Sequence, residues 1–133
     1  MHCKESSAGR WLACLELWLS GQQGFKDVFE YQKYTYKMAD EMGGLEFTIF
    51  DDSFVPIGYL YLLQSASWHR PTPGLDVSIL VINKDHQSSR KVLEIARQTI
   101  VDVAERFDLK WYSRVKHVNS TTDIVITKEI NRG

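Results

Sequence analysis

The sequence predicts an α/β (α+β) domain in which a mixed sheet is flanked by helices. Three observations support this prediction: a nearly continuous apolar run at residues 75–83, a segment with helical periodicity at 90–107, and a second β-forming run at 111–118. A strand, a crossover helix and a further strand form the βαβ unit, which places its two strands parallel. The turn before the helix is where such units bind phosphate, because backbone N–H groups and the helix dipole converge there. This turn contains no glycine.

Length and composition predict one domain spanning residues 1–133. The chain has 44% hydrophobic and 25% charged residues, which is typical of a globular protein with a single core. Its net charge of −1 gives no overall field that would attract nucleic acid. No apolar run suits a membrane span or a signal peptide, so we expect a cytoplasmic protein without membrane contact. The two cysteines, Cys3 and Cys14, form no metal-binding pattern, so we expect reduced thiols and no metal site.

Two helices are predicted in the N-terminal third. Residues 2–6 before them fit either a short strand or a disordered lead. The apolar residues of the first helix recur at helical spacing: Trp11, Leu12, Leu15, Trp18 and Leu19. The second helix is predicted over about residues 25–42 and ends at Gly43 and Gly44. Its apolar stripe consists of Phe25, Val28, Phe29, Gln32, Tyr36 and Ala39.

These two helices carry more aromatic side chains than a small core can obviously bury. The aromatic residues are Trp11, Trp18, Phe25, Phe29, Tyr31, Tyr34 and Tyr36. Aromatic side chains left at a surface tend to anchor interfaces. We therefore expect a protein partner or self-association, with Trp11, Trp18, Tyr31 and Tyr34 as the contacting residues.

The middle of the chain predicts a β-hairpin followed by a loop. Residues 45–50 and 56–66 are rich in β-forming residues, and turn residues separate them. Pro56 stands at a strand entry, where a missing N–H is tolerated. Residues 67–74 are predicted as a loop, because two prolines and a glycine disfavour regular structure.

The C-terminal half completes the pattern. The run at 75–83 is nearly apolar throughout, as expected for a central strand covered on both faces. The helix at 90–107 has a stripe formed by Val92, Ala96, Ile100, Val103 and Phe107. After the strand at 111–118, a turn at 119–122 leads to a last strand at 123–130.

In this order and with these lengths, the chain resembles the GNAT superfamily of acyl-CoA-dependent N-acetyltransferases from about residue 6 to 130. The segment FTIFDDSFVPIGYLYLL resembles the hairpin of that family, and VSILVINKDHQSSRKVLEIA takes the place of its coenzyme A-gripping strand, turn and helix. VKHVN ends at Asn119, where the family often carries asparagine. The resemblance implies a mostly antiparallel sheet with one parallel central pair.

Three departures from the family stand beside the resemblance. The pyrophosphate motif of the family falls on residues 87–92, where Gln87 fits but Arg90 and Val92 replace small residues. Glycine serves there because the backbone approaches the phosphates without an intervening Cβ. No helix follows Asn119, although the family usually places one there, often with a tyrosine that protonates the leaving thiolate. A single final strand leaves the last hairpin incomplete unless another chain supplies a strand.

The resemblance also implies which residues would hold acetyl-CoA. The backbone of 80–82 would bind the pantetheine arm if the central strands splay, and an ordinary paired strand is the alternative. Residues 88–91 would hold phosphate through side chains, and an exposed helix start is the alternative. The cofactor candidates are Leu80, Val81, Ile82, Gln87, Ser88, Ser89, Arg90, Lys91, Val92 and Asn119. The candidates for proton transfer are Asp76, Tyr112 and His117, each of which also fits a structural role.

The lost glycine turn, the absent helix and the aromatic N-terminal helices together predict a non-catalytic binding or structural component that needs no cofactor. Small divergent domains that resemble this one occur among bacteriophage proteins, including particle-associated ones. By that analogy we expect a location in the host cytoplasm or the virion. The alternative is an active N-acetyltransferase, in which an amine attacks the thioester of acetyl-CoA directly.

Overall fold

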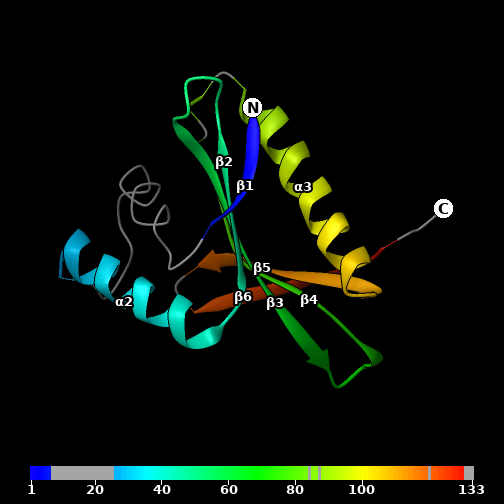
Figure 1. Cartoon of the computed structure of the whole chain (residues 1–133). Helices are drawn as coiled ribbons and strands as arrows, with labels where there is room; N and C mark the ends of the chain where they lie inside the picture. The colour runs from blue at the N-terminus through cyan, green and yellow to red at the C-terminus, as the bar shows by residue number, and fades with distance from the viewer. Residues whose placement is uncertain (7–25, 84, 87, 120, 131–133) are drawn as a thin grey trace.

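A computed structural model describes residues 1–6, 26–83, 85–86, 88–119 and 121–130 of the chain (Figure 1). Its described strands form one six-stranded sheet in the order β1-β2-β3-β4-β5-β6. The strands are β1 (His2–Ser6), β2 (Leu45–Phe50), β3 (Pro56–Ser67), β4 (Arg70–Ile82), β5 (Trp111–Asn119) and β6 (Thr122–Glu129). The helices are α2 (Val28–Met42) and α3 (Ser89–Arg106). All neighbouring strands are antiparallel except β4 and β5, so the predicted fold class is confirmed.

Helix α3 covers one face of the sheet and forms the main core together with it. Its buried residues are Val92, Ala96, Ile100, Val103 and Ala104. They pack on Ile49, Ile57, Leu60, Leu62, Leu75 and Val77 from β2, β3 and β4. Phe107, which the sequence placed in the apolar stripe, lies after the helix and is exposed. The helical period therefore predicted the buried face correctly up to Val103.

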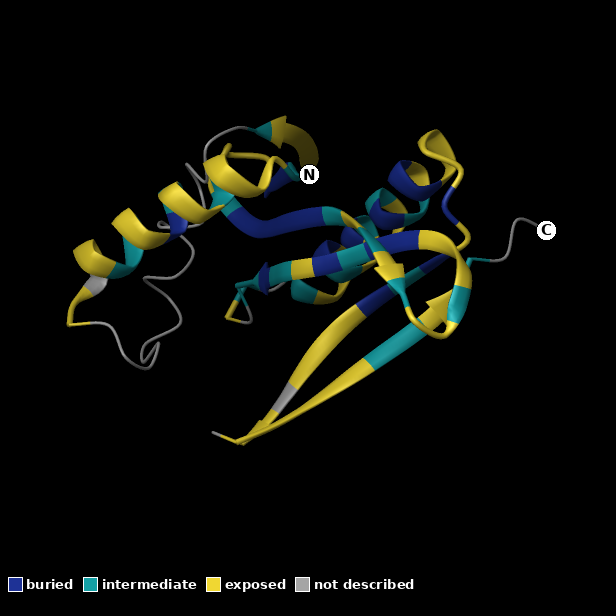
Figure 2. Cartoon of the chain, turned by 90° about the horizontal axis from the view of Figure 1, so that it is seen from below, coloured by how far each residue is buried: buried dark blue, intermediate teal, exposed yellow. Residues whose placement is uncertain are grey.

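Helix α2 begins later than the sequence predicted. The carboxylate of Asp27 accepts the backbone N–H of Glu30 at 2.8 Å and caps the helix, so the first helical residue is Val28. Gly43 ends the helix at φ 65°, a left-handed conformation that favours glycine. Phe29 was predicted in the apolar stripe, but its side chain is 79% exposed. Figure 2 shows that most of α2 is exposed.

The prediction of a loop at residues 67–74 is wrong. Strand β3 continues to Ser67, and β4 already begins at Arg70, which pairs with Ser67. Proline removes one backbone donor but keeps an extended conformation, so it is tolerated where that donor has no strand partner. The indole N–H of Trp111 also holds this segment, because it donates to the carbonyl oxygen of Thr72 at 2.8 Å.

A β-bulge in β4 separates the two parts of the sheet. The pairing with β3 steps from Ile79 directly to Val77, which leaves Ser78 as the extra residue. The parallel pairing of β4 with β5 covers only Leu75 to Val77 and ends at the same place. Bulges bend a strand and increase its twist. Figure 2 shows β5 and β6 leaving the rest of the sheet as a long exposed hairpin.

Candidate functional site

The strands β4 and β5 splay, which answers the question that the sequence left open. Beyond Val77, β4 continues to Ile82 and pairs with β3 on one edge. Beyond Arg114, β5 pairs only with β6 among the described residues. The side chains of Leu80 and Ile82 pack toward α3, and Val81 packs with Tyr59 and Tyr61 on the opposite face. The β5-facing edge of residues 80–82 is therefore the place where an extended ligand could bind to backbone groups.

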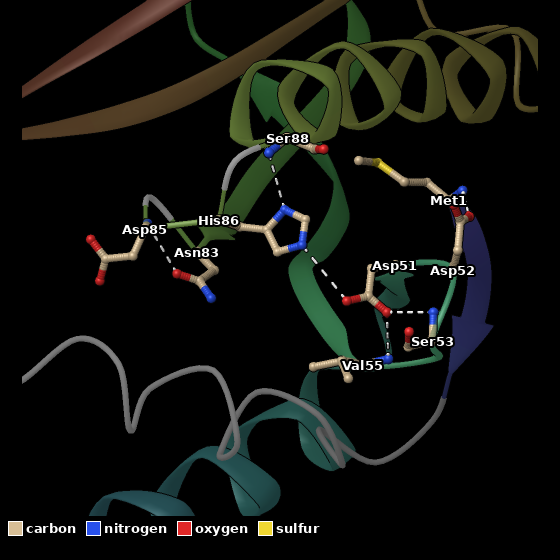
Figure 3. Close-up of polar contacts among 9 residues, drawn as sticks. All are labelled: Met1, Asp51, Asp52, Ser53, Val55, Asn83, Asp85, His86 and Ser88. Carbon is tan, nitrogen blue, oxygen red and sulfur yellow. Dashed lines mark hydrogen bonds and ion pairs between the residues drawn. The ribbon is translucent and has the colours of Figure 1, made fainter.

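The turn between β4 and α3 uses its own backbone donors. The N–H of Asn83 donates to the carbonyl of Ile57, and the N–H of Asp85 donates to the side chain of Asn83. The N–H of Ser88 donates to Nδ1 of His86 at 3.1 Å, and the N–H of Ser89 donates to the carbonyl of His86. Figure 3 shows the imidazole of His86 turned toward Ser88. These internal bonds occupy donors that a phosphate cradle would need free.

A carboxylate from the neighbouring hairpin faces this turn. Nε2 of His86 lies 3.7 Å from a carboxylate oxygen of Asp51, as Figure 3 shows. The other oxygen of Asp51 accepts the backbone N–H groups of Ser53 and Val55, which fixes the β2–β3 turn. A negative charge held beside the start of α3 disfavours a second anion at that position.

The first turn of α3 divides into exposed and buried positions. Ser88 is the cap residue, yet its side chain makes no capping hydrogen bond. Arg90 and Lys91 are exposed, so their cations are accessible at the helix start. Val92 is fully buried, and a Cβ on Gly58 would lie 2.8 Å from its Cγ1. Val92 therefore packs the helix against β3.

Two further candidates for cofactor binding lie outside this turn or outside the described residues. Asn119 ends β5 five residues beyond Arg114, the last β5 residue that pairs with β4. Its side-chain oxygen accepts the N–H and the hydroxyl of Thr121 and closes the β5–β6 turn. Gln87 lies outside the described residues, so its role stays a prediction.

The structure does not bring the proton-transfer candidates together. Asp76 pairs beside Ser113, on the face opposite α3, and accepts the hydroxyl of Ser78 at 2.7 Å. Tyr112 packs against the core on the α3 face. The backbone of His117 lies further along β5, opposite Asp123, and its side chain is outside the described residues. Asp76 is thus the candidate that lies at the point where the sheet opens.

A buried carboxylate that the sequence pattern did not reveal lies on the same face as Asp76. The hydroxyl of Tyr59 donates to Glu46, and both residues are buried. Burial raises the pKa of the Tyr59 phenol, and the hydrogen bond to Glu46 raises that pKa further. Beside them the hydroxyls of Thr48 and Ser6 lie 3.1 Å apart. The alternation of Glu46 and Thr48 with Phe47 and Ile49 was the available signal, but it normally indicates a solvent-facing row.

Of the four aromatic residues predicted at an interface, the structure describes two. Tyr34 is exposed and Tyr31 is half-buried, both on α2. Trp11 and Trp18 lie outside the described residues. No helix among the described residues has the length and apolar character needed to cross a membrane. The same residues contain no cluster of side chains suited to a metal ion.

Comparison with known proteins identifies the fold. No protein-family model and no curated protein sequence matches this chain. Among solved structures, the aminoglycoside 6'-N-acetyltransferase AAC(6')-Ig from Acinetobacter haemolyticus superposes with a TM-score of 0.65 at 15% identity, covering 90% of this chain and 82% of that one. A probable acetyltransferase gives 0.63 at 11% identity, covering 92% and 83%. The ribosomal-protein-alanine N-acetyltransferase from Brucella melitensis biovar Abortus 2308 gives 0.60 at 11% identity, covering 82% and 74%. The chain therefore has the GNAT fold.

Proposed function

We propose that this chain is a GNAT-fold protein that works by binding, without acetyl transfer. The observation that carries the proposal is the internal hydrogen bonding of the described residues of the turn between β4 and α3. The N–H groups of Asp85, Ser88 and Ser89 are bonded within the turn, and the carboxylate of Asp51 faces it. A pyrophosphate would have to displace these bonds and overcome the negative charge, which reduces its affinity.

The catalytic groups support the same proposal. Asp76 and Tyr112 lie on opposite faces of the sheet, so their side chains do not form an acid–base pair. A short turn joins β5 directly to β6, so the segment that carries a thiolate-protonating tyrosine in many related folds is a strand here.

The partner of such a binding protein is expected at α2. Phe29 is 79% exposed, and Tyr34, Met38 and Met42 are exposed on the same helix. Exposed aromatic and methionine side chains are enriched at interfaces. Sedimentation of the full chain should show an assembly that Phe29→Ser weakens. Trp68→Ser, which changes an exposed aromatic residue at the β3–β4 turn, should leave the assembly intact. If the wild-type chain, with Phe29 and Trp68 in place, sediments as a monomer, self-association is ruled out.

A second function, N-acetyl transfer from acetyl-CoA, is favoured by the opening between β4 and β5. In this reaction the backbone of residues 80–82 would hold the pantetheine arm, and the side chains of Arg90 and Lys91 would hold the phosphates. A neutral amine attacks the thioester carbonyl, Asp76 accepts the amine proton, and the thiolate of coenzyme A leaves. Asp76 supports this role because it lies at the point where the pairing ends.

One titration separates the two functions. Acetyl-CoA is added to the full chain while its melting temperature is followed, because a ligand at a hundred times its Kd stabilises a protein by about 2.7 kcal/mol. We expect no shift at millimolar acetyl-CoA. A shift that Arg90→Glu abolishes and Lys37→Glu preserves would show that the start of α3 holds the cofactor. Thiol release with a panel of primary amines, lost in Asp76→Asn, would then establish the transferase.

A further inference from the structure

A small cavity lies between α3 and the sheet where β4 and β5 pair. Its volume is about 150 Å³. The apolar part of its lining, called the floor below, consists of Val77, Leu80, Leu93 and Ile100. An engineered cavity of this volume with entirely apolar walls binds benzene. The cavity therefore has room for one aromatic ring or for a short aliphatic chain.

Three cations from three different elements line the same cavity. They are Arg97 of α3, Arg114 of β5 and Lys128 of β6, and Tyr112 also lines the cavity. The antiparallel register places Lys128 of β6 directly opposite Tyr112 of β5, and Tyr112 precedes Arg114 by two residues. The side chains of Tyr112, Arg114 and Lys128 therefore share the face that α3 covers. None of the described residues that line the cavity is acidic. Within the described residues, none of the three cations has an ion-pair partner.

Other hollows of the molecule differ in this respect. The hollow beside Trp111 contains Arg70 and Lys110, but it also contains Glu129, which lies 3.6 Å from Arg70. The hollow beside Cys3 contains both Asp102 and Arg106. Each of these two hollows is therefore lined by both positive and negative side chains. Because Arg97, Arg114 and Lys128 are exposed, solvent weakens their mutual repulsion, and a bound anion would relieve what remains of it.

We infer that this cavity binds a small organic anion, with its ring or short chain on the apolar floor and its acidic group among Arg97, Arg114 and Lys128. Arginine binds carboxylate and phosphate through paired hydrogen bonds, so either acidic group suits the site. This inference goes beyond the proposed function. Leu80 is the one cavity-lining residue that also belongs to the edge considered for pantetheine. The inference holds whether or not acetyl-CoA binds.

Calorimetric titration of the full chain with phenyl phosphate tests the inference, and benzoate in a parallel titration separates phosphate from carboxylate. We expect saturable binding of at least one of the two, and binding at least tenfold weaker for phenol, which lacks the charge, and for inorganic phosphate, which lacks the ring. Raising the salt concentration should weaken binding only partly, because the apolar contact persists.

Variants locate the binding. Arg114→Gln and Arg97→Gln should each lower the affinity about tenfold or more. Arg106→Gln, on the same helix but outside the cavity lining, should leave the affinity unchanged. Leu93→Phe, which keeps all three cations and adds volume at the floor, should abolish binding, with the melting temperature confirming that the variant is folded. Equal affinity for inorganic phosphate and phenyl phosphate, unchanged binding in Arg114→Gln, or no binding at millimolar probe would each overturn the inference.

Discussion

The imidazole Nδ1 of His86 accepts a hydrogen bond from the backbone N–H of Ser88 at 3.1 Å. Ser88 is the residue that precedes α3, and its own side chain makes no cap. The histidine ring therefore takes the place of a capping side chain and satisfies one of the free donors at the helix start. The opposite ring nitrogen reaches toward Asp51, so one side chain connects two turns that are distant in sequence.

Replacing His86 by alanine should destabilise the protein modestly. The N–H of Ser88 would lose its acceptor, which costs about 0.5–1.5 kcal/mol, or a few degrees in melting temperature for a domain of this size. His69→Ala is the control, because His69 is exposed in the β3–β4 turn. If both variants melt alike, the imidazole contributes nothing to the start of α3.

Tyr59 should make the stability of the protein sensitive to alkaline pH. The pKa of its phenol is raised in the folded state, first by burial and then by the hydrogen bond to Glu46. Below about pH 10 the phenol is neutral in both states, so its full contribution is present. Above that pH the unfolded chain releases the proton while the folded chain retains it, so the free energy of unfolding falls by up to about 1.4 kcal/mol per pH unit.

Urea unfolding of the wild type and of Tyr59→Phe at pH 8 and pH 11 measures this effect. The substituted ring has no hydroxyl to ionise, so the variant should lose less stability over that interval than the wild type. At pH 8 the variant should be less stable by about 1–3 kcal/mol, because Glu46 loses a buried donor. Tyr34→Phe, at an exposed position, controls for the general effect of tyrosine ionisation. Parallel pH profiles for wild type and Tyr59→Phe would contradict the prediction.

Gly74 should tolerate no side chain. A Cβ at this position would overlap the ring of Trp111, closer than any two carbon atoms can pack. Gly74→Ala should therefore displace the indole, break its hydrogen bond to Thr72 and destabilise the protein by about 1–3 kcal/mol. Tryptophan fluorescence should report the displacement. Pro73→Ala, at the exposed neighbouring position, should leave both the spectrum and the melting temperature close to those of the wild type.

The cap at Asp27 should set where α2 begins. Its carboxylate accepts the N–H of Glu30, and loss of such a cap typically costs about 1 kcal/mol. In Asp27→Ala we expect a small loss of helical circular dichroism and faster hydrogen exchange in the first turn of α2. Asp40→Ala, in the last part of the same helix, should show neither change. Equal exchange in the two variants would mean that other contacts hold the helix start.

Periodicity predicted most of the fold because local burial patterns determine it. The hairpin of β2 and β3, the buried stripe of α3 and the parallel pair of β4 and β5 follow from residues near one another in sequence. The extension of β4 through Pro71 and Pro73 could not be predicted in this way. It depends on Trp111, which packs on Gly74 and bonds Thr72 from a strand nearly forty residues further along the chain.

The candidate site was harder to predict than the fold. Alternation shows which residues of one strand share a face, but it does not relate the faces of two strands joined by a crossover helix. For that reason Asp76 and Tyr112 were grouped together although they lie on opposite faces. The bulge at Ser78 shifts the alternation again, and no local sequence signal specified it. The bonding of His86 to Ser88 likewise depends on side-chain geometry that residue spacing does not determine.

The three residue pairs that join β4 to β5 have a mechanical consequence. Strands β1 and β6 form opposite edges of the sheet, so a tensile force applied between these edges crosses every strand pairing in series. The β4–β5 pairing is the shortest, so it carries that force on the fewest hydrogen bonds and breaks first. Stretching a single molecule should therefore detach the β5–β6 hairpin as one unit, while β1 to β4 stay assembled around α3.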